Sequence, residues 1–493
     1  MEAEKGNKGA ASVYENLTDG QRKLILLTVA IGTFMGPLDS SVVNIALPSI
    51  SKFYQVSLAT VEWVVMSYLL IISSLLLTYG RMGDLYGHKK IYITGFVIFS
   101  FGSLICAVSP SITMLIIFRG VQAVGAGMMM SMGPAIVTNI TPPNQRGKAL
   151  GMIAVSVSVA LTTGPILGGI LTNHFGWQSV FLINIPIGII GILMAEKLLP
   201  ASKQHASQPF DVIGSALLFF ALVCILFPLS YVEKIGWDNP LIISLLLSGA
   251  LVFIFFVVYE KKIPYPMLDL SLFQNRLYSM GNLSALINYM AMYSVILIMP
   301  FYLQHLLQLS PAEAGMMLMP MPLVTMVVAP ISGAFSDKVD TRYVSSLGMG
   351  ITAFGLWLLS NLDADSSKLF IELSLAVIGL GTGMFQTPNN SAVLGTVPPY
   401  RRGIASSMLA IMRNIGMVLG VAIAGAIYSS RLNHLTESLT SRGIEGVALT
   451  TQAYAGAVQA TFFAASLIAL TAVFTSLVRG SLLEKNKQNS LSN

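Results

Sequence analysis

The sequence predicts an all-α polytopic membrane protein, with fourteen transmembrane helices arranged as two six-helix bundles and a two-helix insert. Three observations predict this fold class. Apolar residues make up 54% of the 493 residues and charged residues only 10%, whereas a soluble domain carries about 25% charged residues. Many apolar runs reach about 20 residues, the length that crosses a bilayer as a helix. A long stretch of the chain is also repeated within it.

The composition also restricts the possible functions. So few charged residues exclude a soluble enzyme, a disordered protein and a nucleic-acid-binding protein, and the net charge of +6 is interpreted as loop charge on a membrane protein. The two cysteines, Cys106 and Cys224, lie in separate apolar runs. We therefore expect no disulfide framework, no metal site and no cofactor.

Fourteen apolar runs are predicted to span the membrane. A polar tail, residues 1–22, precedes the first run and is too long and hydrophilic for a signal peptide. We expect an N-terminal bundle at 23–200, an insert at 201–262, a C-terminal bundle at 263–480 and a second tail at 481–493. The predicted spans lie near 24–47, 60–79, 90–108, 111–136, 147–171, 178–196, 211–230, 240–259, 281–303, 314–334, 345–361, 369–393, 403–428 and 456–478.

The basic residues predict the orientation of these spans. If both termini are cytoplasmic, 21 of the 28 lysines and arginines lie on the cytoplasmic side, and Arg119 and Arg413 lie inside spans. Basic residues favour the cytoplasmic side during insertion. We therefore expect a multi-pass protein of the bacterial cell membrane with both termini in the cytoplasm. The segment 431–455 is then a polar external loop.

The internal repeat predicts two halves of the same topology. The stretch from Gly125 to Met152 aligns without gaps on that from Gly381 to Met408, at an offset of 256, with ten of 28 positions identical. A second similarity links Gly80–Asp84 with a stretch 253 residues later. Parallel repeats of this kind suit alternating access, with the substrate site between the two halves.

Asp39 and Arg119 form the first candidate site. A charge in hydrocarbon is costly, so an arginine in the fourth span should face a cavity and have an anionic partner. Asp39 in the first span lies at matching depth, because each residue is nine positions from the outer end of its span, or about 13 Å. We interpret the two as proton-coupling residues. A static ion pair that braces two helices is the alternative.

Arg413 and Glu62 are the other charged candidates for the membrane interior. Arg413 lies midway through the thirteenth span, where it would favour an anionic or zwitterionic substrate or require an acidic neighbour. Glu62 lies at the outer mouth of the second span. An exposed vestibule charge is the alternative interpretation of Glu62.

Polar and aromatic residues within the spans are candidates for the rest of the substrate pathway. Aromatic faces and methionines suit bulky, lipophilic or cationic ligands, and simple packing is the alternative role of each residue. The glycines near 379–383 lie inside a span and lack the lysine of a nucleotide loop, so no ATP is expected. The candidates are Met66, Tyr68, Asn288, Tyr289, Tyr293, Gln386, Asn389 and Asn390.

The loop after the second span reads GRMGDLYGHKK from Gly80 to Lys90. Its glycines permit a tight turn, and Asp84 is placed to accept hydrogen bonds from a helix N-terminus or a loop arginine. The string resembles the signature loop of the major facilitator superfamily, with His88 where a basic residue is usual. This resemblance implies a latch between the cytoplasmic faces of the two bundles. Its conformational-switch residues would be Gly80, Arg81, Gly83, Asp84 and Gly87, with a weaker partner copy at Gly333, Asp337 and Arg342.

Two further strings make the resemblance more specific. The TGPILGG string from Thr163 to Gly169 is similar to the antiporter signature of the superfamily, which implies switching roles for its glycines and proline. The LDSSVVNIALP string from Leu38 to Pro48 resembles the drug–proton antiporters with fourteen helices. The switching residues implied by the first string are Gly164, Pro165, Gly168 and Gly169.

The sequence thus predicts a proton-coupled antiporter, not an enzyme, that exports small amphipathic organic compounds such as drugs, antiseptics and lipophilic cations. Its partners would be the substrate, protons and the lipid bilayer, with no nucleic acid, and it would function as a monomer. An exporter dedicated to an anionic or zwitterionic metabolite or antibiotic is the alternative. A proton-coupled importer and a non-transporting receptor or scaffold on the same fold are the remaining rivals.

Overall fold

The protein is helical throughout the parts that its structure, a computed structural model, describes: residues 17–141, 146–200, 211–235, 238–263, 270–336, 339–397 and 402–480. No strand occurs within these ranges. The N-terminal elements are α1 (Asp19–Tyr54), α2 (Leu58–Val61), α3 (Trp63–Tyr86), α4 (His88–Ala107), α5 (Ile112–Ile140), α6 (Arg146–Phe175), α7 (Ser179–Leu182) and α8 (Asn184–Leu198). The remaining elements are α9 (Val212–Ile235), α10 (Pro240–Glu260), η4 (Leu270–Gln274), α11 (Arg276–Phe301), η5 (Tyr302–Leu306), α12 (Pro311–Met317), α13 (Pro320–Ser336), α14 (Thr341–Leu359), α15 (Lys368–Gly395), α16 (Arg402–Ser441) and α17 (Gly446–Val478).

Twelve stretches within the described ranges are long and apolar enough to cross a membrane. Each of the fourteen predicted spans coincides with helical structure, but α9 and α14 are not among these twelve. The described apolar part of α9 is short, at Val212–Ile225, whereas α14, with 19 residues, is as long as Leu58–Leu76, which is among the twelve, so α14 is not excluded by its length. The prediction of many membrane-spanning helices is therefore supported, while the count of fourteen stays a prediction.

One predicted loop is wrong. The segment 431–455 belongs to α16 and α17, which are joined by a turn of four residues after Ser441. Polar side chains ended the apolar run in the sequence, but they do not end a helix, because the backbone hydrogen bonds continue where the helix leaves the hydrocarbon.

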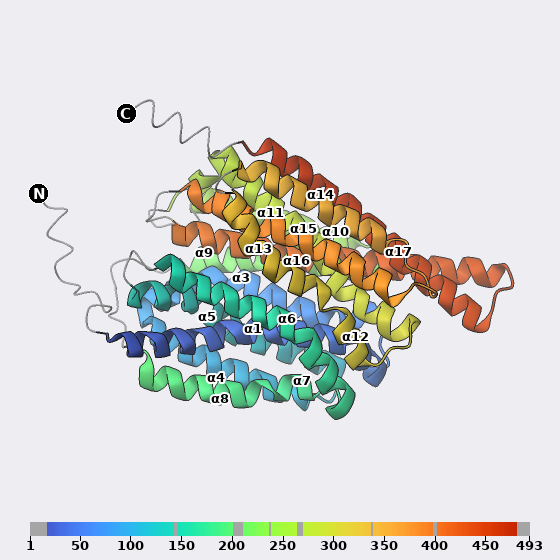
Figure 1. Ribbon diagram of the computed structural model, residues 1–493, viewed down its shortest axis with the longest axis horizontal. Helices are drawn as coiled ribbons and strands as arrows, with labels where there is room; N and C mark the ends of the chain where they lie inside the picture. Colours follow the sequence, from blue (N-terminus) through green and yellow to red (C-terminus); the bar gives the residue numbers. More distant parts are fainter. Residues whose placement is uncertain are drawn as a thin grey trace, which may run out of the picture.

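The helices form two bundles that lie side by side (Figure 1). We call them the N-half (α1–α8) and the C-half (α11–α17), and α9 and α10 pack on each other and, through α9, on α3 and α16. We call the end that carries the start of α1 and the end of α17 the tail end. The opposite end, with the turn between α16 and α17, is the hairpin end. The halves touch mainly through α6 with α12, α3 with α16, and α1 with α11, and to a lesser extent through α6 with α13, α2 with α16, and α1 with α12.

Each half contains the same close helix crossing, as the repeat predicts. A Cβ atom on Gly125 of α5 would lie 2.5 Å from the Gly95 carbonyl oxygen of α4. A Cβ atom on Gly381 of α15 would lie 2.5 Å from the Gly348 carbonyl oxygen of α14. Only a residue without a side chain permits backbones to approach so closely. The offsets between the paired glycines, 256 and 253, are those found in the sequence.

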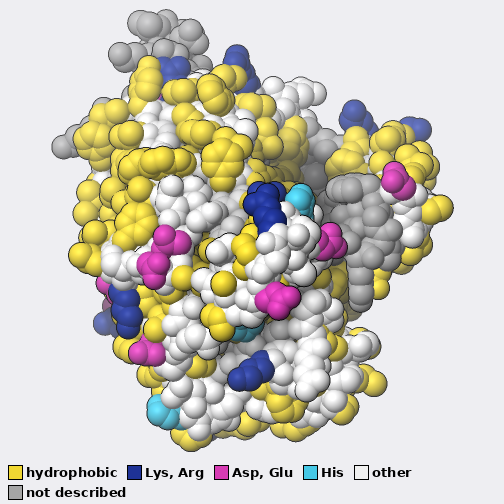
Figure 2. All heavy atoms as spheres, turned by 90° about the vertical axis from the view of Figure 1, so that its right-hand side faces the viewer, with side chains coloured by type: hydrophobic (Ala, Val, Ile, Leu, Met, Phe, Trp, Pro, Cys, Tyr) yellow, Lys and Arg dark blue, Asp and Glu magenta, His cyan; other side chains and the backbone are white. Residues whose placement is uncertain are grey.

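The outer surface is suited to lipid. Large apolar side chains are exposed along α8 and α10, among them Ile190, Leu193, Leu251 and Phe255. At the hairpin end, by contrast, charged side chains are scattered over the face, while hydrophobic side chains crowd the rim (Figure 2). The described surface is therefore apolar along the helices and more polar at this end.

Candidate functional site

Asp39 and Arg119, the pair that the sequence placed at matching depth, are in contact. Asp39 lies on α1 and is 1% exposed, and Arg119 lies on α5 and is fully buried. A guanidinium nitrogen of Arg119, Nη1, lies 2.5 Å from Oδ2 of Asp39. Because both charges are removed from water, breaking the pair by removing one partner would leave a costly unpaired charge.

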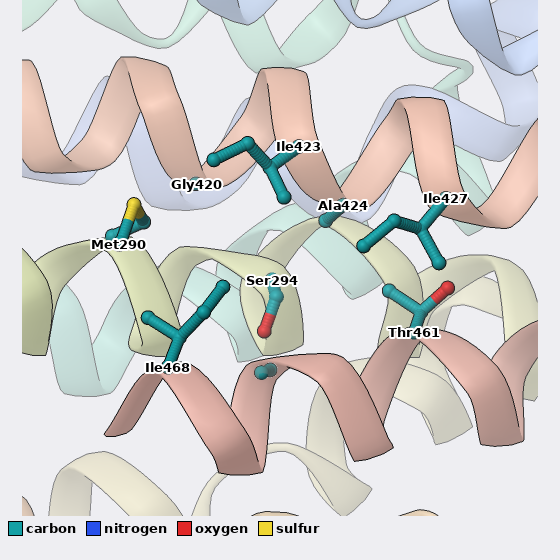
Figure 3. A pocket seen from close by; sticks show the side chains of 9 residues that line it. Met290, Ser294, Gly420, Ile423, Ala424, Ile427, Thr461 and Ile468 are labelled. Carbon is teal, nitrogen blue, oxygen red and sulfur yellow. The ribbon is translucent and has the colours of Figure 1, made fainter. Parts of the chain in front are cut away.

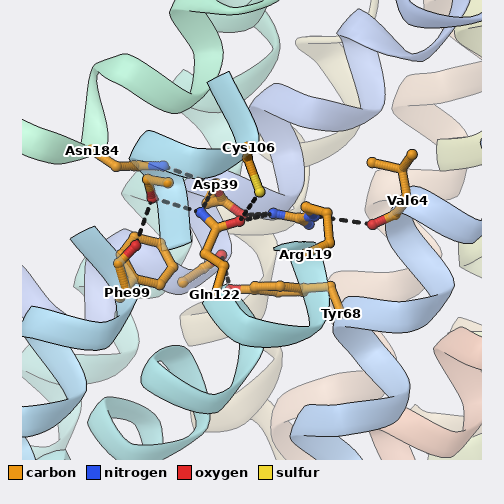
Figure 4. A network of polar contacts seen from close by, with 10 residues as sticks. Asp39, Val64, Tyr68, Phe99, Cys106, Arg119, Gln122 and Asn184 are labelled. Atoms are coloured by element: carbon orange, nitrogen blue, oxygen red, sulfur yellow. Dashed lines mark hydrogen bonds and ion pairs between the residues drawn. The ribbon is translucent and has the colours of Figure 1, made fainter. Parts of the chain in front are cut away.

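Two amides complete the surroundings of the Asp39 carboxylate (Figure 4). Gln122 of α5 and Asn184 of α8 each donate a side-chain N–H to Oδ1 of Asp39, at 2.8 Å. Gln122 also donates to the Ser103 hydroxyl of α4 at 2.8 Å, and its carbonyl oxygen accepts from Arg119 at 2.6 Å. The carboxylate is thus held by side chains from two further helices and has three donors.

Arg119 is fixed from its other side by α3. Its Nε donates to the Val64 carbonyl oxygen at 3.0 Å. The guanidinium carbon lies 4.0 Å from the centre of the Tyr68 ring and 5.7 Å from that of Phe181. A guanidinium stacks favourably on an aromatic face. Tyr68, predicted as a substrate-pathway residue, therefore also forms one wall of the ion-pair site.

Part of this network was not predicted from the sequence. Gln122 lies one helical turn after Arg119 and was visible in the same string. Asn184 is an amide within a largely apolar span, which is a signal for a buried polar contact, but nothing in the sequence indicates that its partner is 145 residues away. Ser103 gives no such signal, because serine is common in apolar helices.

The antiporter-like string packs directly beside the ion pair. A Cβ atom on Gly164 of α6 would lie 2.3 Å from the Ser41 hydroxyl oxygen, and one on Gly168 would lie 2.8 Å from the Val42 carbonyl oxygen. Ser41 and Val42 follow Asp39 by two and three residues on α1. The glycines therefore bring α6 against the part of α1 that carries the acid.

The same string also contacts the backbone of the C-half. A Cβ atom on Gly169 would lie 2.4 Å from the Pro311 carbonyl oxygen, and one on Gly315 of α12 would lie 2.1 Å from the Pro165 carbonyl oxygen. Each glycine thus faces the backbone of the opposite half. Gly315 was not singled out in the sequence, because a lone glycine near the start of an apolar run carries no distinctive signal.

The predicted latch is described only in part. Gly87, with φ of 93°, both ends α3 and begins α4, so one residue makes the turn. Gly80 faces Ser131 of α5, and Gly333 faces the matching Thr387 of α15. The side chains of Arg81 and Asp84, and all of Asp337, lie outside the described residues. Arg342 lies 3.9 Å from Asp340 and donates to the Tyr343 hydroxyl. The latch itself therefore stays a prediction.

The substrate-pathway candidates on α3, α11 and α16 fall into two groups. Met66, Tyr68, Asn288 and Tyr293 are buried, and Tyr289 and Arg413 are half-buried. The guanidinium carbon of Arg413 lies 5.9 Å from the Tyr289 ring centre. Neither polar atom of the buried Asn288 amide has a hydrogen-bond partner among the described residues.

On α15, Asn389 belongs to a different cluster. Its amide donates to the Gly281 carbonyl oxygen at 3.0 Å and accepts from Arg479 at 2.8 Å. Arg479, which follows the last residue of α17, is 1% exposed and also donates to Ser345 at 3.2 Å. Burial lowers the pKa of Arg479 to about 10, so it remains protonated at neutral pH. Asn389 thus ties helix ends together, whereas the neighbouring candidates Gln386 and Asn390 are half-buried.

Glu62 is not an exposed vestibule charge. It is 1% exposed at the junction of α2 and α3 and packs against Gly425 of α16, where an added Cβ atom would lie 1.9 Å from a carboxylate oxygen. This acid therefore sits at the contact between the two halves.

A small pocket between α11, α16 and α17 lies apart from these residues. It has an empty volume of about 210 Å³ and a mostly apolar lining that includes Met290, Ser294 and Ile468 (Figure 3). None of the predicted site residues lines it. A pocket of this size within one half has no chemistry that would select a substrate.

Comparisons with known proteins agree with this architecture. The family model of the Major Facilitator Superfamily matches residues 29–273 and 282–491. The riboflavin transporter RibZ of Clostridioides difficile is 36% identical over 84% of this chain and 90% of its own length. The multidrug transporter protein MdtP of Bacillus subtilis is 30% identical over 85% of this chain and 78% of its own.

A solved structure shares the fold. A bacterial homologue of the human lysosomal transporter Spinster, in an inward-facing and unoccupied conformation, matches with a TM-score of 0.69. It covers 94% of this chain and 98% of its own length at 16% identity. The chain therefore belongs to the Major Facilitator Superfamily and is a multi-pass membrane transporter rather than an enzyme.

Proposed function

We propose that the protein is a proton-coupled antiporter that exports small amphipathic organic compounds across the bacterial cell membrane. The observation that carries this proposal is the buried Asp39–Arg119 ion pair with its two amide donors. An ionisable pair inside a membrane protein is costly and marks an ion or substrate pathway. The relatedness to multidrug transporters supports export of such compounds.

The proposed coupling step takes place at the Asp39 carboxylate. Protonation removes its charge and with it the Coulomb attraction to Arg119, which keeps its contacts to Val64, Tyr68 and Gln122. Because the α6 glycines pack on α1 directly after Asp39, a shift of α1 would reach the α6–α12 contact between the halves. Proton binding and opening of the hairpin end would then be linked.

The proposed architecture has fourteen membrane spans and both termini in the cytoplasm. The N-terminal bundle would occupy 23–200, the insert 201–262 and the C-terminal bundle 263–480. The bias of basic residues toward the tail end and its loops supports this orientation. Asp84 and its glycines would latch the tail end when the substrate site is open outward. The monomer would be sufficient, because the repeat supplies both halves of the site.

Transport of a flavin is a second candidate function. The observation that favours it is the 36% identity to a riboflavin transporter over most of both chains. A flavin transporter differs from the proposed exporter in its substrate, and it could also carry that substrate inward.

The experiment that tests the proposal uses proteoliposomes with an imposed pH gradient. We expect the unaltered protein to move an amphipathic dye, either cationic ethidium or anionic fluorescein, in exchange for protons, and Asp39→Asn to abolish the gradient-dependent part. Asp19→Asn, at an exposed acid paired with Arg22, is the matched control and should transport normally. Riboflavin in the same assay tests the second candidate.

Two results would count against the coupling role. Equal dye movement by the protein and its Asp39→Asn variant would remove Asp39 from coupling. Ligand binding without any proton-linked movement of dye or riboflavin would favour a receptor or scaffold.

A further inference from the structure

The half-buried Arg413 of α16 has no hydrogen-bond or ion-pair partner among the described residues, unlike the buried Arg119 and Arg479. Arg119 pairs with Asp39, and Arg479 is held by Asn389 and Ser345. Among the described residues, no acid lies within ion-pair distance of Arg413. Its guanidinium carbon instead lies over the face of the Tyr289 ring, 5.9 Å from the ring centre. An arginine in the middle of a membrane-spanning helix needs an anion or a set of hydrogen-bond acceptors. A bound substrate can supply this anion or these hydrogen-bond acceptors.

The surroundings of Arg413 are aromatic and lie at the contact between the halves. Tyr293 of α11, 5% exposed, lies near Arg413 on its own half and beside Ser40 of α1 in the other half. It is also close to Tyr68, whose ring stacks on Arg119. Tyr293 thus lies near both Arg413 of the C-half and Tyr68, which adjoins the ion pair of the N-half.

This combination selects for a particular ligand chemistry. Tyrosine rings offer flat apolar faces for an aromatic ring, and a guanidinium offers a planar fork that matches a carboxylate with two parallel hydrogen bonds. A lipophilic cation would gain the aromatic contacts but would be repelled by Arg413.

We infer that the cluster of Arg413, Tyr289 and Tyr293 binds a planar aromatic organic anion, with Arg413 on the anionic group and the tyrosines on the ring. This inference rests on the proposed function only in placing the substrate site between the halves. It narrows the substrate class from amphipathic compounds in general to aromatic anions.

The test measures equilibrium binding to the purified full-length protein in lipid nanodiscs, without any pH gradient. The probe is fluorescein at mildly alkaline pH, a planar aromatic anion, and its binding is followed by fluorescence anisotropy. We expect Arg413→Gln to weaken fluorescein binding by about tenfold or more, because a charge-assisted hydrogen bond pair is lost. Arg413→Lys should weaken it less, since the charge stays while the planar fork is lost.

Two controls make the result specific. Arg431→Gln removes an exposed arginine farther along the same helix and should leave fluorescein binding unchanged. Ethidium, a planar aromatic cation, should bind more weakly than fluorescein and should gain affinity in Arg413→Gln. Tyr289→Leu, which leaves the charge of Arg413 in place, should also weaken fluorescein binding. This variant tests the same site if Arg413→Gln does not fold.

The outcomes separate this inference from the proposed function. Absence of fluorescein binding, or equal affinity in the protein, Arg413→Gln and Tyr289→Leu, would overturn the inference while leaving proton-coupled transport of cations intact. Fluorescein binding that depends on Arg413, in a protein that shows no gradient-driven transport, would support the inference while the proposed coupling fails.

Discussion

At the scale of single residues, the negative charge of Asp39 is shared among one guanidinium and two amides, each from a different turn or helix. Scarcity of charge made Asp39 and Arg119 predictable, because almost every other charged residue could be assigned to a loop. The amide of Asn184 could not be paired in advance, since uncharged polar residues in a span do not reveal which helix they face. For Glu62 only the alternative of an exposed vestibule charge is wrong, because closeness to a span's end does not fix exposure when another half packs over it.

The ion pair predicts strong coupling between two substitutions. Arg119→Gln should destabilise the protein by about 3–5 kcal/mol, because it leaves a buried carboxylate without its cation. Adding Asp39→Asn should restore much of this loss, so the double variant should be less unstable than the sum of the single variants. Thermal unfolding of the unaltered protein, the two single variants and the double variant, all in one detergent, measures this coupling. Strictly additive losses would show that the two side chains do not stabilise each other.

At the scale of helices, apolar run length predicted where spans lie but not where helices end. α16 continues to Ser441 and α17 begins at Gly446, whereas the apolar runs placed their limits at 428 and 456. Hydropathy reports contact with hydrocarbon, and a helix does not stop at the membrane surface if its backbone hydrogen bonds continue. The close crossings of α4 with α5 and α14 with α15 were predictable as a pair, because the repeat carries the same glycines in both halves.

The contact of α6 with α12 predicts the effect of a single methyl group. Gly315→Ala would place its Cβ atom 2.1 Å from the Pro165 carbonyl oxygen, so the two helices must separate, at a cost of about 1–3 kcal/mol. We expect spin labels at exposed hairpin-end positions, Phe175 in the N-half and Asp365 in the C-half, to move apart in electron resonance distance measurements.

Gly350→Ala provides the control for this methyl group. Nothing lies within 4 Å of a Cβ atom at Gly350, so the label distance should stay unchanged there. An unchanged distance in Gly315→Ala as well would mean that the halves do not depend on this contact for closure.

At the scale of the whole molecule, the two halves touch near the middle and at the hairpin end through Gly169, Gly315 and the α3–α16 pair. An additional bond joins them there, from the Gln304 amide of η5 to the Ile45 carbonyl oxygen at 3.0 Å. A transporter that alternates between two openings needs a contact of this kind that forms and breaks once in each cycle.

The proposed latch at the tail end predicts a change in accessibility. Asp84→Asn should weaken the closed tail end and raise the rate at which a thiol reagent modifies a cysteine introduced on that face, in a background with Cys106 and Cys224 replaced by serine. Asp19→Asn, another acid at the same end, serves as the comparison. An unchanged rate in Asp84→Asn would exclude a latch through this carboxylate.

The length of the α16 helix has a practical consequence. Its 40 residues extend for about 60 Å, twice the hydrocarbon thickness of about 30 Å, and with α17 it forms a helical hairpin that projects past the other helices at the hairpin end (Figure 1). Leu435 and Gly456 pack the two helices of this hairpin together, which makes it a firm epitope. An antibody fragment raised against it would add mass and shape for electron cryomicroscopy without contacting either Asp39 or Arg413.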